Sequence, residues 1–424
     1  MKLLIKNGTI ITSDRTEVNR DILIEDNKIS CIGEGISDAV DQIIDAKGLA
    51  VLPGLVDAHC HLRDPGYEYK EDIKSGSMSA AKGGFTSIAC MPNTNPVIDN
   101  ESIVRTIMEK ASHEAVVNVY PIGAITKGLE GNELAEMGSM KAAGIVAVSD
   151  DGKPVMQASV MKKALIYAGG FGLTVISHCE DLNLAEGGSM NEGETSTRLG
   201  IHGIPSAAED VMVSREIILS EYTGMPVHIA HVSTKGAVEM IRQAKKRGVL
   251  VTAETCPHYF TLTEKACEGY NTNAKMNPPL RTQKDVDAVI QGLKDGTIDI
   301  IATDHAPHHF DEKNVEFEMA LNGIVGFETA LPLALTYLVR PGILDLNQLV
   351  DKMSTKPSRI LKIDKGDIRA GADADLVLVN LDEEYTIDTN EFLSKSKNSP
   401  FGGFKVTGRV KYTLVGGRIV YQDR

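Results

Sequence analysis

Long apolar runs are missing from this sequence. A bilayer-spanning helix needs about 20 apolar residues in a row, and no stretch approaches that length. The first residues, Met1-Lys-Leu-Leu-Ile-Lys, lack the apolar core and cleavage site of a signal peptide. Basic residues are also in deficit, because 44 Lys and Arg face 58 Asp and Glu, a net charge of -14. We therefore expect neither a membrane protein nor a nucleic-acid binder.

Paired cysteines and nucleotide-binding loops are absent as well. The six cysteines show no CxxC spacing and are scattered: Cys31, Cys60, Cys90, Cys179, Cys256 and Cys267. This pattern predicts reduced thiols in a cytoplasmic protein, not a disulfide framework or a thiolate zinc site. Neither GxxxxGK[ST] nor a GxGxxG at a strand-to-helix turn occurs, so nothing supports nucleotide binding.

What is present is an alternation of apolar strands and amphipathic helices. Eight strand candidates lie near residues 51–58, 85–92, 116–124, 144–149, 173–178, 226–231, 249–255 and 298–303. Helical spacing occurs between them, in 72–82, 103–111, 155–167, 207–220 and 236–246. Eight successive strand–helix units predict an α/β protein with a TIM-like (β/α)8 barrel, and 424 residues suffice for one with an appendage. An open doubly wound sheet is the alternative, and it would keep the first and last strands apart.

Both ends of the chain show short β segments instead. Residues 1–55 and 363–424 alternate around glycines and turn pairs such as Asn7-Gly8 and Asp26-Asn27. The simplest arrangement is one small β-sandwich domain built from both ends, beside a catalytic barrel of residues 56–362. Two unrelated β appendages are the alternative. The glycine-rich stretch 182–205 is either a lid or a solvated excursion.

Five apolar runs end in side chains that bind metal ions. His59 and His61 close the first predicted strand, and because they are two residues apart both imidazoles point the same way. The other runs end in Asp151, His178, His231 and Asp304. Barrel enzymes place their chemistry at the C-terminal ends of strands, so these six residues are expected to meet in one site. A satisfied core histidine is the alternative for any one of them taken singly.

Four imidazoles and two carboxylates are enough to hold two divalent cations. We expect His59, His61 and Asp304 on one ion, His178 and His231 on the other, and Asp151 between them. Nitrogen and oxygen ligands without thiolate suit Zn²⁺, with manganese or cobalt as substitutes. Two zinc ions per chain, bridged by Asp151 and a hydroxide, would form a nucleophile at neutral pH. Asp304 is the expected catalytic residue, as general base and then acid.

Four more residues are expected where a substrate would lie, and they suit an anionic one. Arg63 is two residues after His61 and can fork onto a carboxylate. Asn93 and Asn277 can donate to the same anion, and His308 to a carbonyl oxygen. A solvated arginine or a turn-forming asparagine is the structural alternative.

Several segments resemble bacterial dihydroorotases of the amidohydrolase superfamily. They are Asp57-Ala-His-Cys-His-Leu-Arg-Asp-Pro-Gly66, Met91-Pro-Asn-Thr94, Ser149-Asp-Asp-Gly152, Ser177-His-Cys-Glu-Asp181, His228-Ile-Ala-His-Val-Ser233 and Ala302-Thr-Asp-His-Ala-Pro-His308. The resemblance covers nearly the whole chain. It implies reversible hydrolysis of (S)-dihydroorotate to N-carbamoyl-L-aspartate, in de novo pyrimidine biosynthesis. It also implies that Arg63, Asn93 and Asn277 hold the substrate carboxylate, with His308 and the Asn322-Gly323 backbone on the ring.

One position separates relatives within that superfamily. Hydantoinase-like members bridge their metals with a carboxylated lysine at the end of strand four, where this chain has Asp151. Lys153 lies beyond the strand end, and its modification is not expected. A hydantoinase or allantoinase is the alternative enzyme, and an inactive scaffold for aspartate transcarbamoylase is the alternative outside catalysis. A homodimer and a transcarbamoylase partner both stay open.

Overall fold

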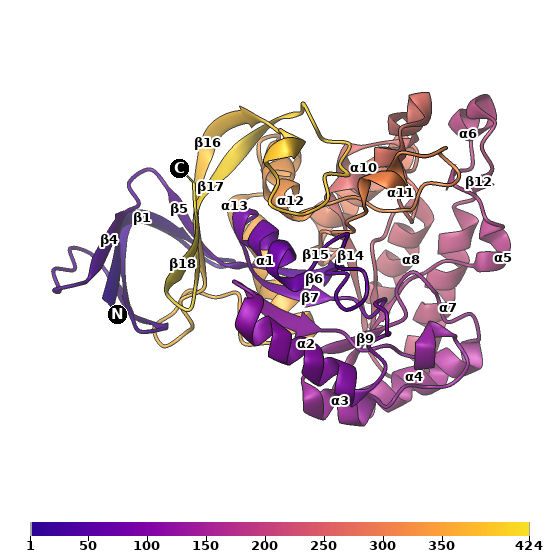
Figure 1. Ribbon diagram of the computed structural model, residues 1–424, viewed down its shortest axis with the longest axis horizontal. Helices are drawn as coiled ribbons and strands as arrows, with labels where there is room; N and C mark the ends of the chain where they lie inside the picture. The colour runs from indigo at the N-terminus through magenta and orange to yellow at the C-terminus, as the bar shows by residue number, and fades with distance from the viewer. Residues whose placement is uncertain (1, 424) are drawn as a thin grey trace.

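Strands from the two ends of the chain lie together at one end of the molecule (Figure 1). The computed structural model describes residues 2–423, and its largest sheet has eight strands in the order β18-β17-β16-β5-β1-β2-β3, with β4 paired to β1. Their bounds are β1 (Lys2–Ile11), β2 (Thr16–Glu25), β3 (Lys28–Gly33), β4 (Gln42–Asp45), β5 (Ala50–Pro53), β16 (Leu376–Thr386), β17 (Lys405–Val415) and β18 (Arg418–Gln422). The antiparallel pairing of β16 with β5 joins the two ends, which excludes two unrelated appendages.

Alternating apolar residues give this sheet a core of its own. Side chains from β1 to β5, β16 and β17 cluster on one face, among them Ile5, Ile22 and Leu378, all fully buried. The Asn7-Gly8 pair, expected to end a strand, instead lies within β1. Asn7 takes a positive φ of 60° and the pairing of β1 with β2 shifts register there, so the pair forms a bulge.

The central strands form a ring of eight. They are β6 (Leu55–Cys60), β7 (Phe85–Cys90), β8 (Asn118–Pro121), β9 (Ala147–Ser149), β10 (Thr174–Ser177), β13 (Val227–Ile229), β14 (Val251–Thr255) and β15 (Ile300–Ile301). Parallel pairing forms two groups of neighbouring strands, one in the order β6-β7-β8 and one in the order β9-β10-β13-β14-β15. Isolated parallel bridges, Gly123 with Val148 and Cys60 with His305, join these two groups at both seams. The first and last strands are therefore neighbours, as the barrel prediction requires and an open sheet does not.

The first predicted strand is divided in the structure. Residues 51–58 were expected to be one strand, but β5 ends at Pro53 and pairs with β16, whereas β6 begins at Leu55 and pairs with β7. Gly54 lies between them. The error is physical, because a continuous apolar run does not reveal that its two halves pair with different sheets. The division into domains of 1–55 with 363–424 and 56–362 stays a prediction.

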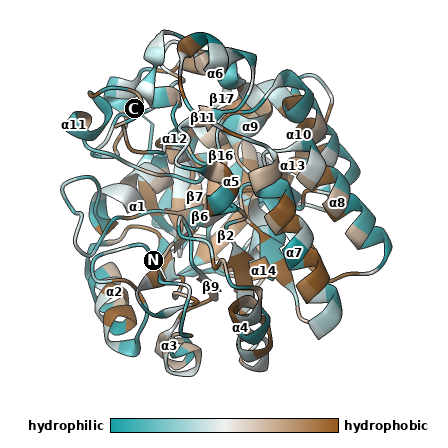
Figure 2. Ribbon diagram, turned by 90° about the vertical axis from the view of Figure 1, so that its right-hand side faces the viewer, coloured by the Kyte–Doolittle hydropathy of each residue, from teal (hydrophilic) through white to brown (hydrophobic). Residues whose placement is uncertain are grey.

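Helices surround the barrel strands (Figure 2). They are α1 (Ile73–Lys82), α2 (Glu101–Glu114), α3 (Met137–Ala143), α4 (Ala158–Gly170), α5 (Leu182–Ala185), α6 (Glu194–Leu199), α7 (Ala207–Thr223), α8 (Lys235–Lys246), α9 (Pro257–Thr261), α10 (Gln283–Asp295), α11 (Phe310–Lys313), α12 (Phe327–Ala334), α13 (Leu346–Val350) and α14 (Lys356–Leu361). The five predicted helical segments overlap α1, α2, α4, α7 and α8. Across residues 2–423, no helix has the length and hydropathy to cross a bilayer.

The remaining elements are short helical turns and one pair of two-residue strands. They are the helical turns η1 (Lys127–Leu129), η2 (Glu264–Tyr270), η3 (Thr272–Ala274), η4 (Leu335–Val339), η5 (Asp351–Thr355) and η6 (Thr389–Glu391), and the paired strands β11 (Met190–Asn191) and β12 (Gly203–Ile204). The stretch 182–205 thus folds into α5, β11, α6 and β12. Arg281 donates to the Asn191 side chain and to the Ile204 carbonyl, both at 3.0 Å, and so ties this excursion to the barrel.

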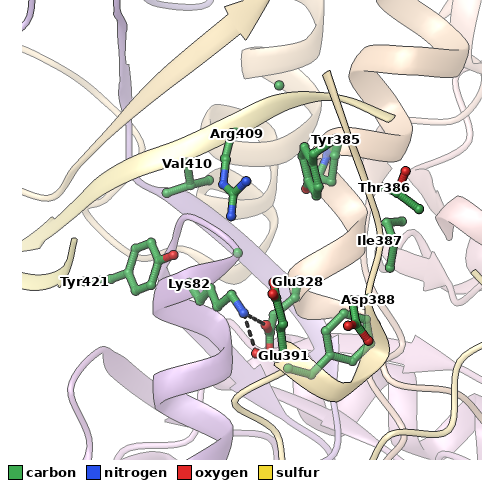
Figure 3. A pocket seen from close by; sticks show the side chains of 14 residues that line it. Lys82, Glu328, Tyr385, Thr386, Ile387, Asp388, Glu391, Arg409, Val410 and Tyr421 are labelled. Atoms are coloured by element: carbon green, nitrogen blue, oxygen red, sulfur yellow. Dashed lines mark hydrogen bonds and ion pairs between the residues drawn. The ribbon is translucent and has the colours of Figure 1, made fainter. Parts of the chain in front are cut away.

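A small hollow marks the contact between barrel and sheet (Figure 3). Lys82, the last residue of α1, pairs with Glu328 of α12 at 2.9 Å and donates to the Glu391 carbonyl at 2.6 Å. Arg409 of β17 pairs with Asp423 at 3.2 Å. Both cations therefore already have protein partners, and the Lys82–Glu391 hydrogen bond links α1 to the segment that follows β16.

Candidate metal centre

The six predicted metal ligands meet at the C-terminal ends of the barrel strands. A cavity of about 220 Å³ opens there and is lined by His61, Asp151, His178, His231 and Asp304. His59 lies beneath them, fully buried. His59 lies in β6, and the other five residues follow β6, β9, β10, β13 and β15. Barrel closure therefore brings together positions up to 245 residues apart in sequence.

The first half of the centre contains His59, His61 and two carboxylates. His59 Nε2 lies 3.4 Å from Asp151 Oδ1 and 3.6 Å from Asp304 Oδ1. His61 Nε2 lies 3.5 Å from Asp151 Oδ2 and 3.1 Å from Asp304 Oδ1. The geometry therefore points the Nε2 atoms of both histidines at the same two carboxylates.

The second half contains His178 and His231. His178 Nδ1 and His231 Nε2 each lie 3.6 Å from Asp151 Oδ1, and 2.7 Å from one another. The side chains form two groups with metal-binding geometry: His59, His61 and Asp151, and Asp151, His178 and His231. Asp151 belongs to both, as expected of a bridging carboxylate.

The donor atoms fit divalent cations. Two ligand atoms on one tetrahedral zinc ion, each about 2.0–2.1 Å from it, lie about 3.3 Å apart, close to most of the separations seen here. His59 Nε2 is buried without a hydrogen-bond partner, which is costly for a polar atom unless another group binds it. Its ring is oriented for that purpose, because Nδ1 donates to Glu254 Oε1 at 2.6 Å and leaves the Nε2 lone pair directed at the carboxylates.

Opposite charges decide the protonation of these groups. Burial alone would raise the pKa of the Asp304 carboxyl, but His61 and His59 hold the pKa below its usual value. Burial likewise opposes ionisation of Asp151, and the surrounding imidazoles bring its pKa well below the usual range. Both carboxylates are therefore ionised near neutral pH, as metal ligands must be.

Glu254 and His228 lie behind the predicted ligands, and the sequence analysis selected neither of them as a site residue. Glu254 is fully buried on β14; it accepts from His59, and its Oε2 lies 3.1 Å from His228 Nε2. His228 Nδ1 in turn lies 2.8 Å from Thr252 Oγ1. The available signal was Thr252 and Glu254, which are two residues apart in β14 and so point to the same side of the strand.

Arg63 and Asn93 lie at the wall of the same cavity. Arg63 Nε donates to the Pro307 carbonyl at 3.1 Å, and its Nη2 lies 3.3 Å from His308 Nε2. Asn93 Oδ1 accepts from His61 Nδ1 at 2.9 Å, which directs the His61 Nε2 lone pair toward the centre. Asn93 is thus placed to orient a ligand as well as to face a substrate.

The remaining predicted substrate residues also line the cavity: Asn277, His308, Asn322 and Gly323. Asn277 Nδ2 donates to Glu180 Oε2 at 3.0 Å, and Asn277 Oδ1 is buried without a partner. His308 Nε2 lies 2.7 Å from the Asn322 carbonyl oxygen. All six predicted substrate residues therefore border the cavity that contains the predicted metal ligands.

Two neighbouring residues point elsewhere. Lys153 is exposed and does not line the cavity. His305, next to Asp304, stacks on Phe327 with ring centroids 4.0 Å apart and accepts from the Gly326 amide at Nδ1. Its side chain faces away from the centre.

Comparisons with known proteins identify the family. A dihydro-orotase-like family model matches residues 48–237, and an amidohydrolase family model matches residues 273–421. A dihydroorotase of Acetivibrio thermocellus is 63% identical over 424 residues, covering 100% of this chain and 99% of that one. A dihydroorotase of Geobacter sp. strain M21 is 58% identical over the full length of both chains. The chain belongs to the dihydroorotase family.

Solved structures place this dihydroorotase family member among cyclic amide hydrolases. An L-hydantoinase from Arthrobacter aurescens matches with a TM-score of 0.90 and 28% identity, covering 99% of this chain and 96% of that one. A dihydropyrimidinase from Brevibacillus agri matches with a TM-score of 0.88 and 27% identity, covering 100% and 95%. The dihydroorotases are more than twice as similar in sequence. The chain is a metal-dependent cyclic amide hydrolase with a barrel and a β-sandwich, and it acts as a dihydroorotase in pyrimidine biosynthesis.

Proposed function

We propose that the cavity at the barrel mouth is where (S)-dihydroorotate is reversibly hydrolysed to N-carbamoyl-L-aspartate. The observation that carries the proposal is the position of the Arg63 guanidinium, on the wall of the same cavity as the His and Asp cluster. A cyclic amide bearing a carboxylate needs both features. On a chain of net charge -14, a local cation is required to hold such an anion.

The predicted ligand set supports two zinc ions. His59, His61 and Asp304 would hold one, His178 and His231 the other, and Asp151 would contact both. Ions bound there supply Lewis acidity, which makes water nucleophilic at neutral pH and polarises the amide carbonyl. The His59–Glu254 and His61–Asn93 hydrogen bonds orient two of the imidazoles before any ion binds.

Substrate binding and orientation fall to the walls of the cavity. Arg63 would pair with the substrate carboxylate, since a guanidinium matches a carboxylate with two parallel hydrogen bonds. Asn93 and Asn277 would donate to the same anion. His308 and the Asn322-Gly323 backbone would contact the ring, which presents its reacting amide to the Asp304 side.

Asp304 would move the proton. Its ionised carboxylate accepts a proton from the attacking water and donates it to the ring nitrogen as the carbon–nitrogen bond breaks. The low pKa set by His61 and His59 favours the base form at the start of the reaction. In the reverse direction the same carboxylate takes the proton from the carbamoyl nitrogen.

The cellular location of the enzyme and its association partners are also proposals. We place the enzyme in the cytoplasm, as a homodimer or with aspartate transcarbamoylase as partner. Sedimentation of the purified chain, alone and mixed with a transcarbamoylase, tests the two associations. A chain that stays monomeric in both experiments contradicts them.

A direct absorbance assay of dihydroorotate, hydantoin and allantoin tests the function. We expect turnover of dihydroorotate, and about two zinc ions per chain by elemental analysis. Asp304→Asn should lower kcat by about 10²-fold or more, the range for a lost general base, while most metal stays bound. Preferred turnover of hydantoin or allantoin would favour the rival enzymes, no turnover would favour the scaffold, and an active metal-free enzyme would refute the metal chemistry.

A further inference from the structure

Lys313 is a buried lysine without a carboxylate partner among the described residues. Its exposed fraction is 5%, and its ammonium donates to three backbone carbonyls: Leu321 at 2.7 Å, Gly323 at 3.0 Å and Lys275 at 3.2 Å. Lys275 and Lys352 are also buried, but each donates to a single backbone carbonyl, of Glu318 and Ile298 respectively. Burying an ammonium without a counterion is costly, and the three hydrogen bonds made by Lys313 offset part of that cost.

The three carbonyls belong to two loops on one wall of the cavity. Leu321 and Gly323 line it themselves, and Lys275 is two residues before Asn277, which also lines it. The Gly323 amide donates to the Lys275 carbonyl at 3.0 Å, so the loops touch at the point where Lys313 holds them. A larger residue does not fit at Gly323, because a Cβ would lie 2.6 Å from the Ala306 side chain.

We propose that Lys313 is a positioning residue whose ammonium holds the loops of Asn277 and Asn322-Gly323 together, so that the substrate cavity keeps its shape. This rests on the proposed function, since those loops matter as contacts of dihydroorotate. The ammonium has three donors, and each is used by one carbonyl. A neutral amine has two, so loss of the proton would release one of the three contacts.

The same charge adds to the positive field at the cavity wall. Burial first, and then Arg63, Lys313 and Lys70, lower the pKa of His308. Lys70 is paired with Glu312 at 2.8 Å, whereas Lys313 has only carbonyl dipoles. An anionic substrate beside His308 is therefore attracted by Lys313 as well as by Arg63.

The charge on Lys313 depends on pH near neutrality. Burial, reinforced by Lys275, lowers the pKa of Lys313 to about 7, with the Cys267 thiol acting in the opposite direction. The ionisable groups around Lys313 are Lys275, Cys267 on η2, His308 on the adjoining wall and Glu312 on α11, which is paired with Lys70. As pH rises through about 7 the ammonium is lost, so KM for dihydroorotate should rise while kcat changes less.

Steady-state kinetics of three variants test this role. Lys313→Met removes charge and donors, and we expect KM to rise about tenfold or more with a smaller change in kcat, as lost charged hydrogen bonds predict. Lys313→Gln keeps two donors without charge and covers the case in which the Met variant fails to fold. Its KM should be raised and should lack the wild-type step near pH 7. Lys352→Met is the matched control, because Lys352 is 4% exposed and donates to the Ile298 carbonyl, away from the cavity lining.

Hydrogen–deuterium exchange gives a readout that needs no activity. Peptides covering residues 272–278 and 319–325 should exchange faster in Lys313→Met and Lys313→Gln than in wild type, and should be unchanged in Lys352→Met. Unchanged exchange and KM in both Lys313 variants, or an equal rise of KM in the control, would overturn the proposal. A wild-type chain inactive on dihydroorotate would instead overturn the proposed function, and the exchange result would still decide whether Lys313 holds the loops.

Discussion

Glu254 shows what single residues contribute beneath the predicted ligands. The carboxylate contacts two imidazoles, His59 at 2.6 Å and His228 at 3.1 Å, and its Oε1 also accepts from the His231 amide at 3.3 Å. Opposing the effect of burial, His59 and His228 bring the Glu254 pKa far below its usual value. Glu254 is therefore an anion at neutral pH, and it holds the His59 ring and the His231 backbone in place.

Replacement of Glu254 by glutamine should weaken metal binding. An amide has one acceptor oxygen, so it cannot accept from both imidazoles, and the His59 ring loses its fixed tautomer. We expect zinc affinity, measured by competition with a chelator, to fall about 10- to 100-fold. Glu328→Gln is the control, since Glu328 is a buried ion-pair partner at the barrel–sheet contact. Equal affinities for wild type and Glu254→Gln would contradict this role.

At the junction between β5 and β6 the chain crosses from the sandwich sheet into the barrel. The chain leaves the sandwich sheet at Pro53 and enters the barrel at Leu55, so only Gly54 separates two strands with different partners. The Gly54 amide donates to the Asp375 carbonyl at 2.9 Å, on the sheet side. His59 is five residues further on, and its position depends on this junction.

Gly54→Ala should destabilise the protein, because a Cβ at this position would overlap the Thr86 side chain of β7. Overpacking of a buried contact costs about 1–3 kcal/mol, which chemical denaturation can resolve. Gly170→Ala is the matched control, since a Cβ there meets open space at the end of α4. The expected order of stability is control at or above wild type, and Gly54→Ala below both. A Gly54→Ala variant as stable as the control would show that β7 can move to make room.

For the molecule as a whole, the burial of Lys352 makes the free energy of unfolding depend on pH. Lys352, 4% exposed beneath the barrel, donates to the Ile298 carbonyl at 2.7 Å. Burial, with a smaller effect from Lys356, lowers the Lys352 pKa from 10.5 to about 8. Between those values the unfolded chain binds more protons than the folded one, so this residue makes stability rise with pH.

Lys352→Met should remove that contribution. At about 1.4 kcal/mol per pKa unit, the gap between 10.5 and about 8 is worth roughly 3 kcal/mol. The stability of wild type relative to Lys352→Met should therefore grow as the pH is raised from 8 to 10, when denaturation midpoints of the two proteins are compared. Parallel midpoints over that range would mean that Lys352 keeps its charge.

Much of the architecture could be predicted from local pattern. Apolar runs located all eight barrel strands, and residues just after several of them line the cavity, among them His61, Asp151 and Asp304. This succeeded because strand ends of a parallel barrel meet at one rim, so position along the chain converts into position in space. The roles of the six predicted ligands stay predictions, although the structure brings their side chains within reach of one another.

The sequence by itself determined the family, the barrel and the set of candidate ligands, since these depend on residue type and on spacing within a strand. Only the tertiary structure decided that His59 bonds Glu254, 195 residues away, that Gly54 divides one apolar run between two sheets, and that Lys313 joins two loops. Such contacts depend on which distant segments meet after the chain closes. Residue periodicity carries no record of that meeting.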